Sequence, residues 1–263
     1  MKTIILSVVL MGFFMTPALA AIEGQEVDYK VGDKTFKGYL AYDNQATEKR
    51  PGILVVHEWW GQNDYARQRA RMLAELGYVA FALDMYGDGK IATHPDQAGQ
   101  FSQEVASHQE EGKARFLAAL AVLQNFRLTD STRIAAIGYC FGGGVVLNMA
   151  LSALDDLAGV VSFHGGLVLS STQVKPSSIK TKVLICHGGA DQFISADQVK
   201  VYKEMLEAAK VDYQLINYPG AKHSFTNPDA DQLAQKFNLP IGYNKEADEK
   251  SWQDMQQFFK KIF

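Results

Sequence analysis

The chain has 263 residues, of which 47% are hydrophobic and 21% are charged, and its formal net charge is -3 at pH 7. A weakly acidic chain without basic clusters argues against nucleic acid as the main partner. Beyond the first twenty residues no apolar stretch is long enough to cross a bilayer, so we expect the mature protein to have no membrane-embedded part.

The N-terminus has the layout of a secretory signal peptide. Met1-Lys2-Thr3 is a short basic start, Ile4 to Met15 is apolar, and Ala18-Leu19-Ala20 matches a small-x-small cleavage site. The alternative is a membrane anchor, but the apolar run is shorter than the ~20 residues that a spanning helix needs, and Pro17 interrupts its end. We therefore expect cleavage after Ala20, export to the periplasm or the medium, and a monomeric single domain over residues 21–263.

Short apolar runs then alternate with longer stretches of helical period. The predicted strands are Glu26–Val31, Thr35–Tyr42, Gly52–Val56, Tyr78–Leu83, Ile134–Ile137, Ala158–Phe163, Lys182–Cys186 and Tyr213–Tyr218. The predicted helices are Asp64–Leu76, with Asp64 as N-cap and Gly77 as stop signal, then Gln97–Asn125, Gly142–Ala150, Ser195–Ala209 and Lys245–Phe263.

This alternation predicts an α/β fold with a mostly parallel twisted sheet and helices on both of its faces. The first two strands flank Gly32-Asp33 and predict an antiparallel hairpin. Ligands of such open sheets bind beyond the carboxyl ends of the parallel strands. We therefore look for function in the loops that follow Val56, Leu83, Ile137, Cys186 and Tyr218.

One strand-to-helix turn matches the nucleophile elbow G-x-Nuc-x-G. It reads Gly138-Tyr139-Cys140-Phe141-Gly142, with Cys140 as the nucleophile. The turn is so tight that only glycine avoids collision at its flanks, and it holds the nucleophile above the sheet. The N–H groups of Phe141 and Trp59 are the expected oxyanion donors. The alternative is a small buried cysteine that merely packs in a turn.

A base and an orienting acid are expected downstream, because the chain order in this type of site is nucleophile, acid, histidine. Asp191 follows the strand that ends at Cys186, and His223 follows the strand that ends at Tyr218. Cys140, Asp191 and His223 therefore satisfy both the order and the loop positions of a catalytic triad.

The other histidines fit less well. A zinc site made of His57, His187 and His223 lacks short ligand spacing, so we expect no metal and no organic cofactor. His164 ends a strand and is expected to be a satisfied, partly buried polar group. His94 and His108 are expected to be solvated.

Glu58 lies in the segment His57-Glu58-Trp59-Trp60-Gly61, directly after a predicted strand. A partly buried carboxylate is costly unless it is paired or functional, and the two bulky tryptophans would remove water from it. The alternative is a solvated surface glutamate.

Taken together, these segments resemble the dienelactone hydrolase (carboxymethylenebutenolidase-like) family of the α/β-hydrolase superfamily. The resemblance covers nearly all of the mature chain. It is carried by His57-Glu58-Trp59-Trp60-Gly61, Gly138-Tyr139-Cys140-Phe141-Gly142-Gly143, Gly188-Gly189-Ala190-Asp191, His223-Ser224-Phe225 with Asn227-Pro228, and Tyr243-Asn244, Ala247 and Trp252.

The resemblance implies a hydrolase of small carboxylic esters or lactones that works through a thioester acyl-enzyme. Cys140 would attack the carbonyl, His223 would assist proton transfer, and Asp191 would orient His223. Glu58 corresponds to a family glutamate that pairs with the resting thiol and is displaced by substrate. Such a negative neighbour disfavours the thiolate, which suits an oxidising compartment.

The chain departs from the family at Asn227. In the members active on dienelactone, arginines grip the substrate carboxylate, and one of them stands four residues after the histidine. Dienelactone is therefore not assigned as the substrate. We expect Trp60, Tyr86 and Asn227 to line the substrate pocket.

Two other classes of function stay open at this stage. One is a catalytically weak binding protein on the same scaffold, because a fold does not guarantee an activity. The other is a redox protein in which Cys140 and Cys186 cycle through a disulfide, which an oxidising compartment permits.

Overall fold

The computed structural model describes residues 21–152, 154, 156–167 and 179–263. The predicted signal peptide, residues 1–20, lies outside the described residues. In the part of the chain that is described, no helix is long and apolar enough to cross a membrane.

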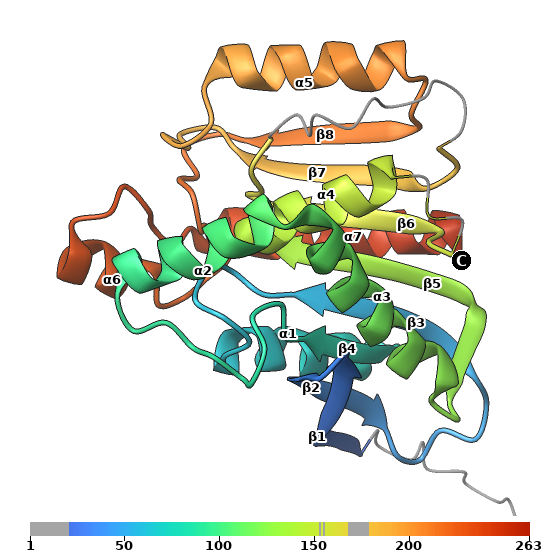
Figure 1. The fold of residues 1–263 in the computed structure, drawn as a ribbon. Helices are drawn as coiled ribbons and strands as arrows, with labels where there is room; N and C mark the ends of the chain where they lie inside the picture. The colour runs from blue at the N-terminus through green and yellow to red at the C-terminus, as the bar shows by residue number, and fades with distance from the viewer. Residues whose placement is uncertain (1–20, 153, 155, 168–178) are drawn as a thin grey trace, which may run out of the picture.

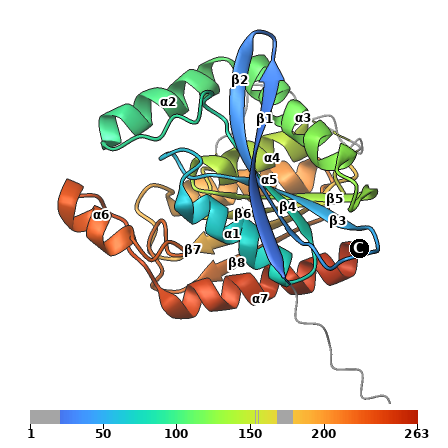
Figure 2. The same cartoon turned by 90° about the horizontal axis from the view of Figure 1, so that it is seen from below.

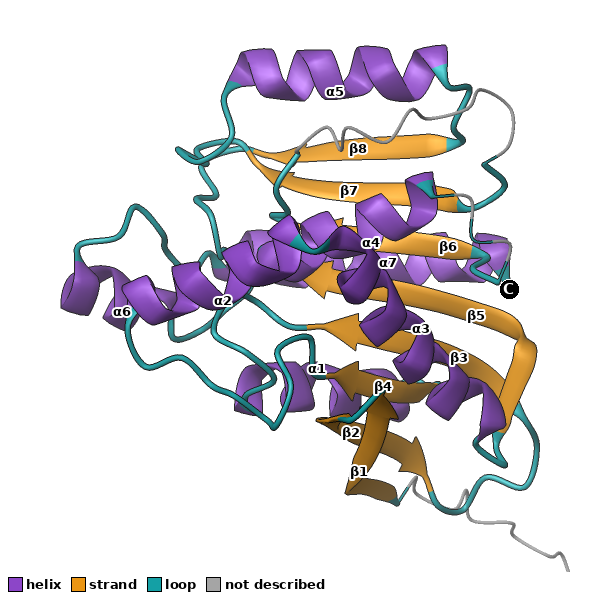
Figure 3. Cartoon of the chain, in the orientation of Figure 1, coloured by secondary structure: helices purple, strands orange, loops and turns teal. Residues whose placement is uncertain are grey.

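Eight strands form a single sheet in the order β1-β2-β4-β3-β5-β6-β7-β8 (Figures 1 and 3). Strands β1 and β2 form the predicted antiparallel hairpin, β2 pairs antiparallel with β4, and all the remaining pairs are parallel. The strands are β1 (Ile22–Val31), β2 (Lys34–Asp43), β3 (Arg50–Val56), β4 (Val79–Leu83), β5 (Thr129–Tyr139), β6 (Gly159–Phe163), β7 (Lys182–Gly188) and β8 (Tyr213–Tyr218).

Helices cover both faces of this sheet, as Figure 2 shows from below. One face packs against α1 and α7, and the opposite face packs against α3, α4 and α5. The helices are α1 (Asp64–Glu75), α2 (Pro95–Ser107), α3 (Gln109–Asn125), α4 (Phe141–Leu151), α5 (Ala196–Ala208), α6 (Ala230–Phe237) and α7 (Lys245–Ile262).

The central strands are apolar throughout because both of their faces are buried. In β3, Leu54 and Val56 belong to the core on the α3 side, whereas Ile53 and Val55 belong to the core on the α1 side. The predicted α/β-hydrolase fold class is thereby confirmed, with helices on both faces and a mostly parallel sheet.

Two local predictions were wrong, and one helix was missed. The predicted helix over residues 97–125 is two helices, because His108 has φ -119° and ψ 63° and leaves the helical conformation. Asn63 rather than Asp64 is the N-cap of α1, and its side chain accepts the N–H of Ala66. The short helix α6 was not predicted at all. It lies beyond the carboxyl ends of the strands (Figure 1), where its residues Leu233 and Phe237 pack in one small apolar cluster with Trp60 and Ala98.

Candidate active site

The turn between β5 and α4 has the geometry that the glycine pattern predicts. Cys140 lies at φ 52° and ψ -115°, a conformation that costs a residue with a side chain about 1–3 kcal/mol. A Cβ on Gly138 would come within 2.1 Å of the carbonyl oxygen of Gly142, and one on Gly142 within 2.3 Å of that of Val56. Neither glycine can therefore be replaced without moving backbone, and the turn is built around Cys140.

The backbone of Cys140 is also held from the neighbouring strand. Its N–H lies 3.0 Å from the carbonyl oxygen of Phe163 and 3.1 Å from Nδ1 of His164 at the end of β6. This shared hydrogen bond stabilises the strained turn from the side of the sheet.

Asp191 and His223 come together at the ends of β7 and β8. Asp191 Oδ2 lies 2.8 Å from Nδ1 of His223, and its other oxygen accepts the N–H of Phe193 at 2.8 Å. Backbone bonds join the two loops, because Ala190 donates to the carbonyl of Ala221 at 2.8 Å. The acid therefore reaches the histidine from a loop whose position is fixed by main-chain contacts.

His223 also interacts with Cys140, so that the three predicted triad residues lie in one cluster. Burial lowers the pKa of His223, but its side-chain interactions with Cys140 and with Asp191, to which it is hydrogen-bonded, raise it to about 10. This raised pKa favours the protonated imidazole at neutral pH. An imidazolium beside a thiol favours the nucleophilic thiolate.

The two expected oxyanion donors come from segments that lie against each other. Gly142 donates its N–H to the carbonyl of His57 at 3.1 Å, which ties the elbow to the segment after β3. Phe141 is the first residue of α4, and an N–H at this position has no partner within the helix. Trp59 is fixed through its carbonyl, which accepts the hydroxyl of Tyr86 at 2.9 Å.

Glu58 is buried, with 2% of its surface exposed, and both of its oxygens have partners. Ser224 donates to Oε1 at 2.9 Å and Asn227 donates to Oε2 at 2.7 Å. Burial raises the pKa of Glu58 above its ordinary value, while these hydrogen bonds and the charges of His223 and Arg69 act against that rise. No hydrogen bond to Cys140 is found among the described residues, so Glu58 does not hold the thiol in this conformation.

The predicted pocket residues have other contacts. Asn227 holds Glu58 through its amide nitrogen and accepts the N–H of Asp229 at 3.0 Å through its oxygen. Trp60 is 5% exposed and packs with Ala92, Ala98 and Phe237, between α2 and α6. Tyr86 is 6% exposed, with its ring 5.5 Å from that of Phe141. All three side chains are therefore nearly fully buried among other residues of the protein.

Several residues near the site were missed by sequence reasoning. Phe193 is 47% exposed, and its ring centroid lies 4.9 Å from that of His223, at the mouth of the site. Ser224 and His164 both have positive φ, 57° and 40°, which is uncommon for residues with side chains. Ser224 lies in a segment that resembles the family and His164 was expected to be a satisfied polar group, but no residue pattern indicated a role for any of the three in the site. His164 lies in the loop after β6, which is not among the loops in which we expect function from the sequence, although β6 also ends at this edge of the sheet.

The remaining titratable groups do not form a second centre. In the described part of the chain, no group of three or more His, Cys, Asp or Glu residues could hold a metal ion. His57, which would have been a zinc ligand, uses both ring nitrogens on the backbone of Glu58 and Met85.

The two cysteines are free thiols. Cys186 is fully buried, and burial raises its pKa to about 12, so that it stays a neutral thiol. This geometry gives no support to a disulfide cycle.

Comparison with known proteins identifies the family of the chain. The sequence profile of the dienelactone hydrolase family matches residues 36–263. Protein usf of Aquifex pyrophilus is 27% identical over 233 residues, covering 85% of this chain and 98% of that protein. A protein provisionally named carboxymethylenebutenolidase, from Aquifex aeolicus strain VF5, is 26% identical over 241 residues, covering 90% and 98%.

A solved structure leads to the same family. It is a dienelactone hydrolase-like promiscuous phosphotriesterase from metagenomic libraries, with 32% identity and a TM-score of 0.86. The match covers 92% of this chain and 99% of that one. Because the family profile and the fold agree over most of its length, the chain belongs to the dienelactone hydrolase family and is a carboxylic ester hydrolase.

Proposed function

We propose that the protein hydrolyses small carboxylic esters or lactones through a thioester on Cys140, with His223 as proton carrier and Asp191 as its orienting group. The strongest support is the cluster itself. A cysteine in a strained elbow interacts with a histidine whose other nitrogen lies 2.8 Å from a buried carboxylate. Each group has the partner that its role requires.

Acylation begins when the Cys140 thiolate attacks the carbonyl carbon. The carbonyl oxygen becomes an oxyanion, which accepts hydrogen bonds from the N–H groups of Phe141 and Trp59. When the intermediate collapses, the C–O bond breaks and the leaving alkoxide takes the proton from His223. The products are the alcohol, or the opened lactone, and a thioester.

Deacylation uses the same residues in reverse. Neutral His223 removes a proton from water as the water attacks the thioester carbonyl. Collapse of this second intermediate breaks the C–S bond and releases the acid. The thiolate and the imidazolium of the resting site are restored.

The surroundings of Glu58 favour a neutral substrate. Asn227 stands where the family's carboxylate-binding arginine would be, and it is engaged in holding Glu58. A buried carboxylate next to the catalytic loop would repel a second negative charge. We propose that Glu58 also tunes the thiol. E58Q should therefore change both the pH dependence of Cys140 alkylation and the rate of turnover, and no change in either quantity would refute this role.

The test is turnover of p-nitrophenyl acetate by wild-type protein and by the matched variants C140A and C186A. C140A should lose about a thousandfold or more in kcat/KM, as expected for removal of a nucleophile. C186A should stay close to wild type, because the Cys186 side chain is fully buried and its sulfur contacts the hydroxyl of Tyr218 rather than His223. Acid quenching should trap an acetyl group on Cys140, detectable by peptide mass spectrometry. Equal turnover by wild type and C140A would exclude the thiol mechanism, and the absence of turnover in both would favour the binding protein.

Phosphotriesters are a second candidate class of substrate, because of the structural likeness to the promiscuous phosphotriesterase. The same thiolate could attack a neutral phosphorus centre, which needs no carboxylate clamp. A p-nitrophenyl phosphotriester in the assay above tests this directly. If C140A no longer releases nitrophenolate, Cys140 is the group that cleaves the phosphotriester. If C140A still releases it, another group is responsible.

We also propose that the protein is exported after cleavage behind Ala20 and acts as a monomer. Intact-mass analysis of protein from a periplasmic or culture fraction would find a chain that starts at Ala21. An uncleaved N-terminus or a dimer in sedimentation analysis would contradict these two proposals.

A further inference from the structure

A buried bridge of hydrogen bonds connects the nucleophile elbow with the loop that carries His223. His164 accepts the N–H of Cys140 at Nδ1, at 3.1 Å, and its Nε2 lies 2.7 Å from Oγ1 of Thr226. Both His164 and Thr226 are fully buried. Thr226 stands three residues after His223, so that the bridge runs from one catalytic residue to the loop of the other.

The contacts assign the tautomer of His164. An N–H donor at Nδ1 requires a lone pair there, so in the neutral ring the proton is on Nε2 and is donated to Thr226. Burial, followed by the charge of His223, lowers the pKa of His164 well below its ordinary value. The ring therefore remains neutral, and its acceptor stays available for the nucleophile.

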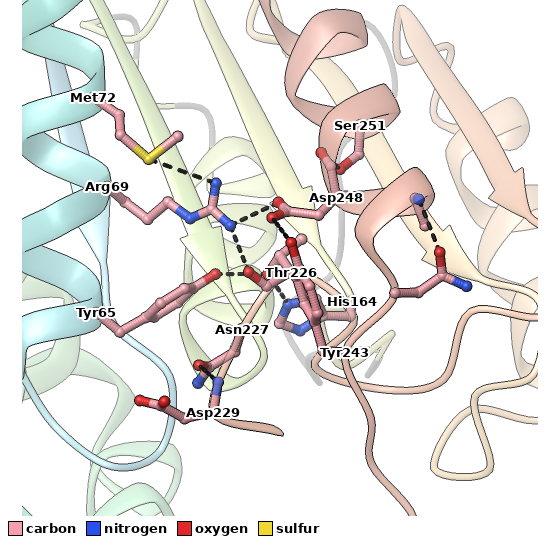
Figure 4. A network of polar contacts seen from close by, with 12 residues as sticks. Tyr65, Arg69, Met72, His164, Thr226, Asn227, Asp229, Tyr243, Asp248 and Ser251 are labelled. Carbon is pink, nitrogen blue, oxygen red and sulfur yellow. Dashed lines mark hydrogen bonds and ion pairs between the residues drawn. The ribbon is translucent and has the colours of Figure 1, made fainter. Parts of the chain in front are cut away.

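The far end of the bridge is anchored by charge (Figure 4). Oγ1 of Thr226 lies 2.6 Å from the hydroxyl of Tyr65. The backbone carbonyl of Thr226 accepts a hydrogen bond from Nη2 of Arg69. Arg69 is paired with Asp248 at 2.6 Å and lies over the ring of Tyr65. A buried ion pair with this many partners fixes the loop far more firmly than a surface contact would.

Such a bridge is needed because the two catalytic residues come from distant strands. Cys140 follows β5 and His223 follows β8, with β6 and β7 lying between these strands in the sheet. His164, at the end of β6, spans part of that gap. Its ring also packs against that of His223, with centroids 5.2 Å apart. The unusual φ of 40° at His164 places the ring between the two loops.

We propose that His164 and Thr226 are positioning residues, which set the spacing between the Cys140 nucleophile and the His223 base through this bridge. The inference rests on the proposed thiol mechanism. Neither side chain touches substrate. They act by fixing the position of one loop relative to the other. Displacing a catalytic group by about 1 Å can cost an enzyme up to about a hundredfold in rate.

The test compares T226V with T226S. Valine keeps the shape and removes the hydroxyl, whereas serine keeps the hydroxyl. T226V should lower kcat/KM for p-nitrophenyl acetate by on the order of tenfold, and T226S should restore it to within about threefold of wild type. The iodoacetamide alkylation rate of Cys140 should follow the same order. It does not depend on ester turnover, so it still tests the bridge if the proposed function fails.

Two outcomes would overturn the proposal. T226V could match wild type in both assays, or T226S could be as impaired as T226V, in which case the hydroxyl is not the cause. A third measurement applies even if T226V does not fold. Nitrogen-15 NMR of histidine-labelled wild-type protein should show His164 protonated at Nε2 only, and a proton at Nδ1 would exclude the bridge.

Discussion

The same sheet carries two cysteines whose surroundings could hardly differ more. Cys140 follows β5 and Cys186 lies within β7, with only β6 between the two strands. Cys140 is partly exposed, has a strained backbone, and interacts with a histidine whose pKa is raised. Cys186 is fully buried in a regular strand, where its sulfur lies 3.6 Å from the hydroxyl of Tyr218.

The contrast teaches that position in the sheet alone does not make a cysteine reactive. What differs is the charge nearby. His223, with its pKa of about 10, offers Cys140 a positive partner, whereas burial holds the pKa of Cys186 at about 12. Reactive cysteines need an electropositive, partly exposed site, and here only one of the two strands provides it.

The largest expected difference is in alkylation. Iodoacetamide at pH 7 should modify Cys140 at least about a thousandfold faster than Cys186, because the thiolate is the nucleophile and Cys186 stays a buried neutral thiol. Peptide mass spectrometry over a time course measures both rates in one sample. Comparable rates, or a disulfide joining the two residues, would mean that the comparison drawn from their environments is wrong.

A smaller effect, on kcat/KM, is expected from replacing the aspartate nearest to each cysteine's polar partner, which is Asp191 for His223 and Asp254 for Tyr218. D191N should lower kcat/KM by about a hundredfold or more, because the carboxylate orients the histidine and stabilises its protonated form. The matched control is D254N. Asp254 accepts the Tyr218 hydroxyl at 2.9 Å on the Cys186 side, so its loss should leave turnover almost unchanged. Equal losses in the two variants would contradict a specific role for Asp191.

How far the sequence predicts this site depends on how local each feature is. The elbow around Cys140 is encoded within five residues, and Asp191 and His223 each follow an apolar strand directly. Parallel strands bring such ends to one edge, so the cluster could be predicted without a structure. At the N-terminus of α1, by contrast, Asn63 and Asp64 are both suitable N-cap residues, and only the structure decides between them.

Contacts between residues that are far apart in the chain could not be predicted from the sequence. Glu58 was expected beside the thiol, yet its partners are Ser224 and Asn227, which are 166 and 169 residues away. The bridge from His164 to Thr226 spans 62 residues, and neither end carries a motif. Such pairings depend on how loops pack above the sheet, which hydrophobic periodicity does not report.

The charge of Cys140 should be visible in the titration of His223. C140S removes the sulfur of Cys140, and the charge of Cys140 raises the pKa of His223 more than the charge of Asp191 does, so this pKa should fall below about 10. In wild type, a raised pKa means that the charge of His223 stabilises the native state fully below pH ~6.5, and that this contribution is lost as the pH rises through about 10. In C140S the loss should begin at lower pH. Histidine NMR titration of the two proteins measures the shift, and an unchanged pKa would show that the pair is not coupled.

The smallest expected effects are on the free energy of unfolding. At Cys140 the comparison is between C140G and C140A, and at Cys186 it is between C186A and wild type. C140G should be more stable than C140A by up to about 1 kcal/mol, because glycine accepts the positive φ of the elbow and alanine retains the strain. C186A should be less stable than wild type by about 1 kcal/mol, since it leaves a small cavity in a fully packed strand. Urea unfolding of the three variants and wild type gives these differences directly. If C140G proved less stable than C140A, the backbone at the nucleophile would not be under strain, and its conformation would have to be explained by the contacts of the thiol instead.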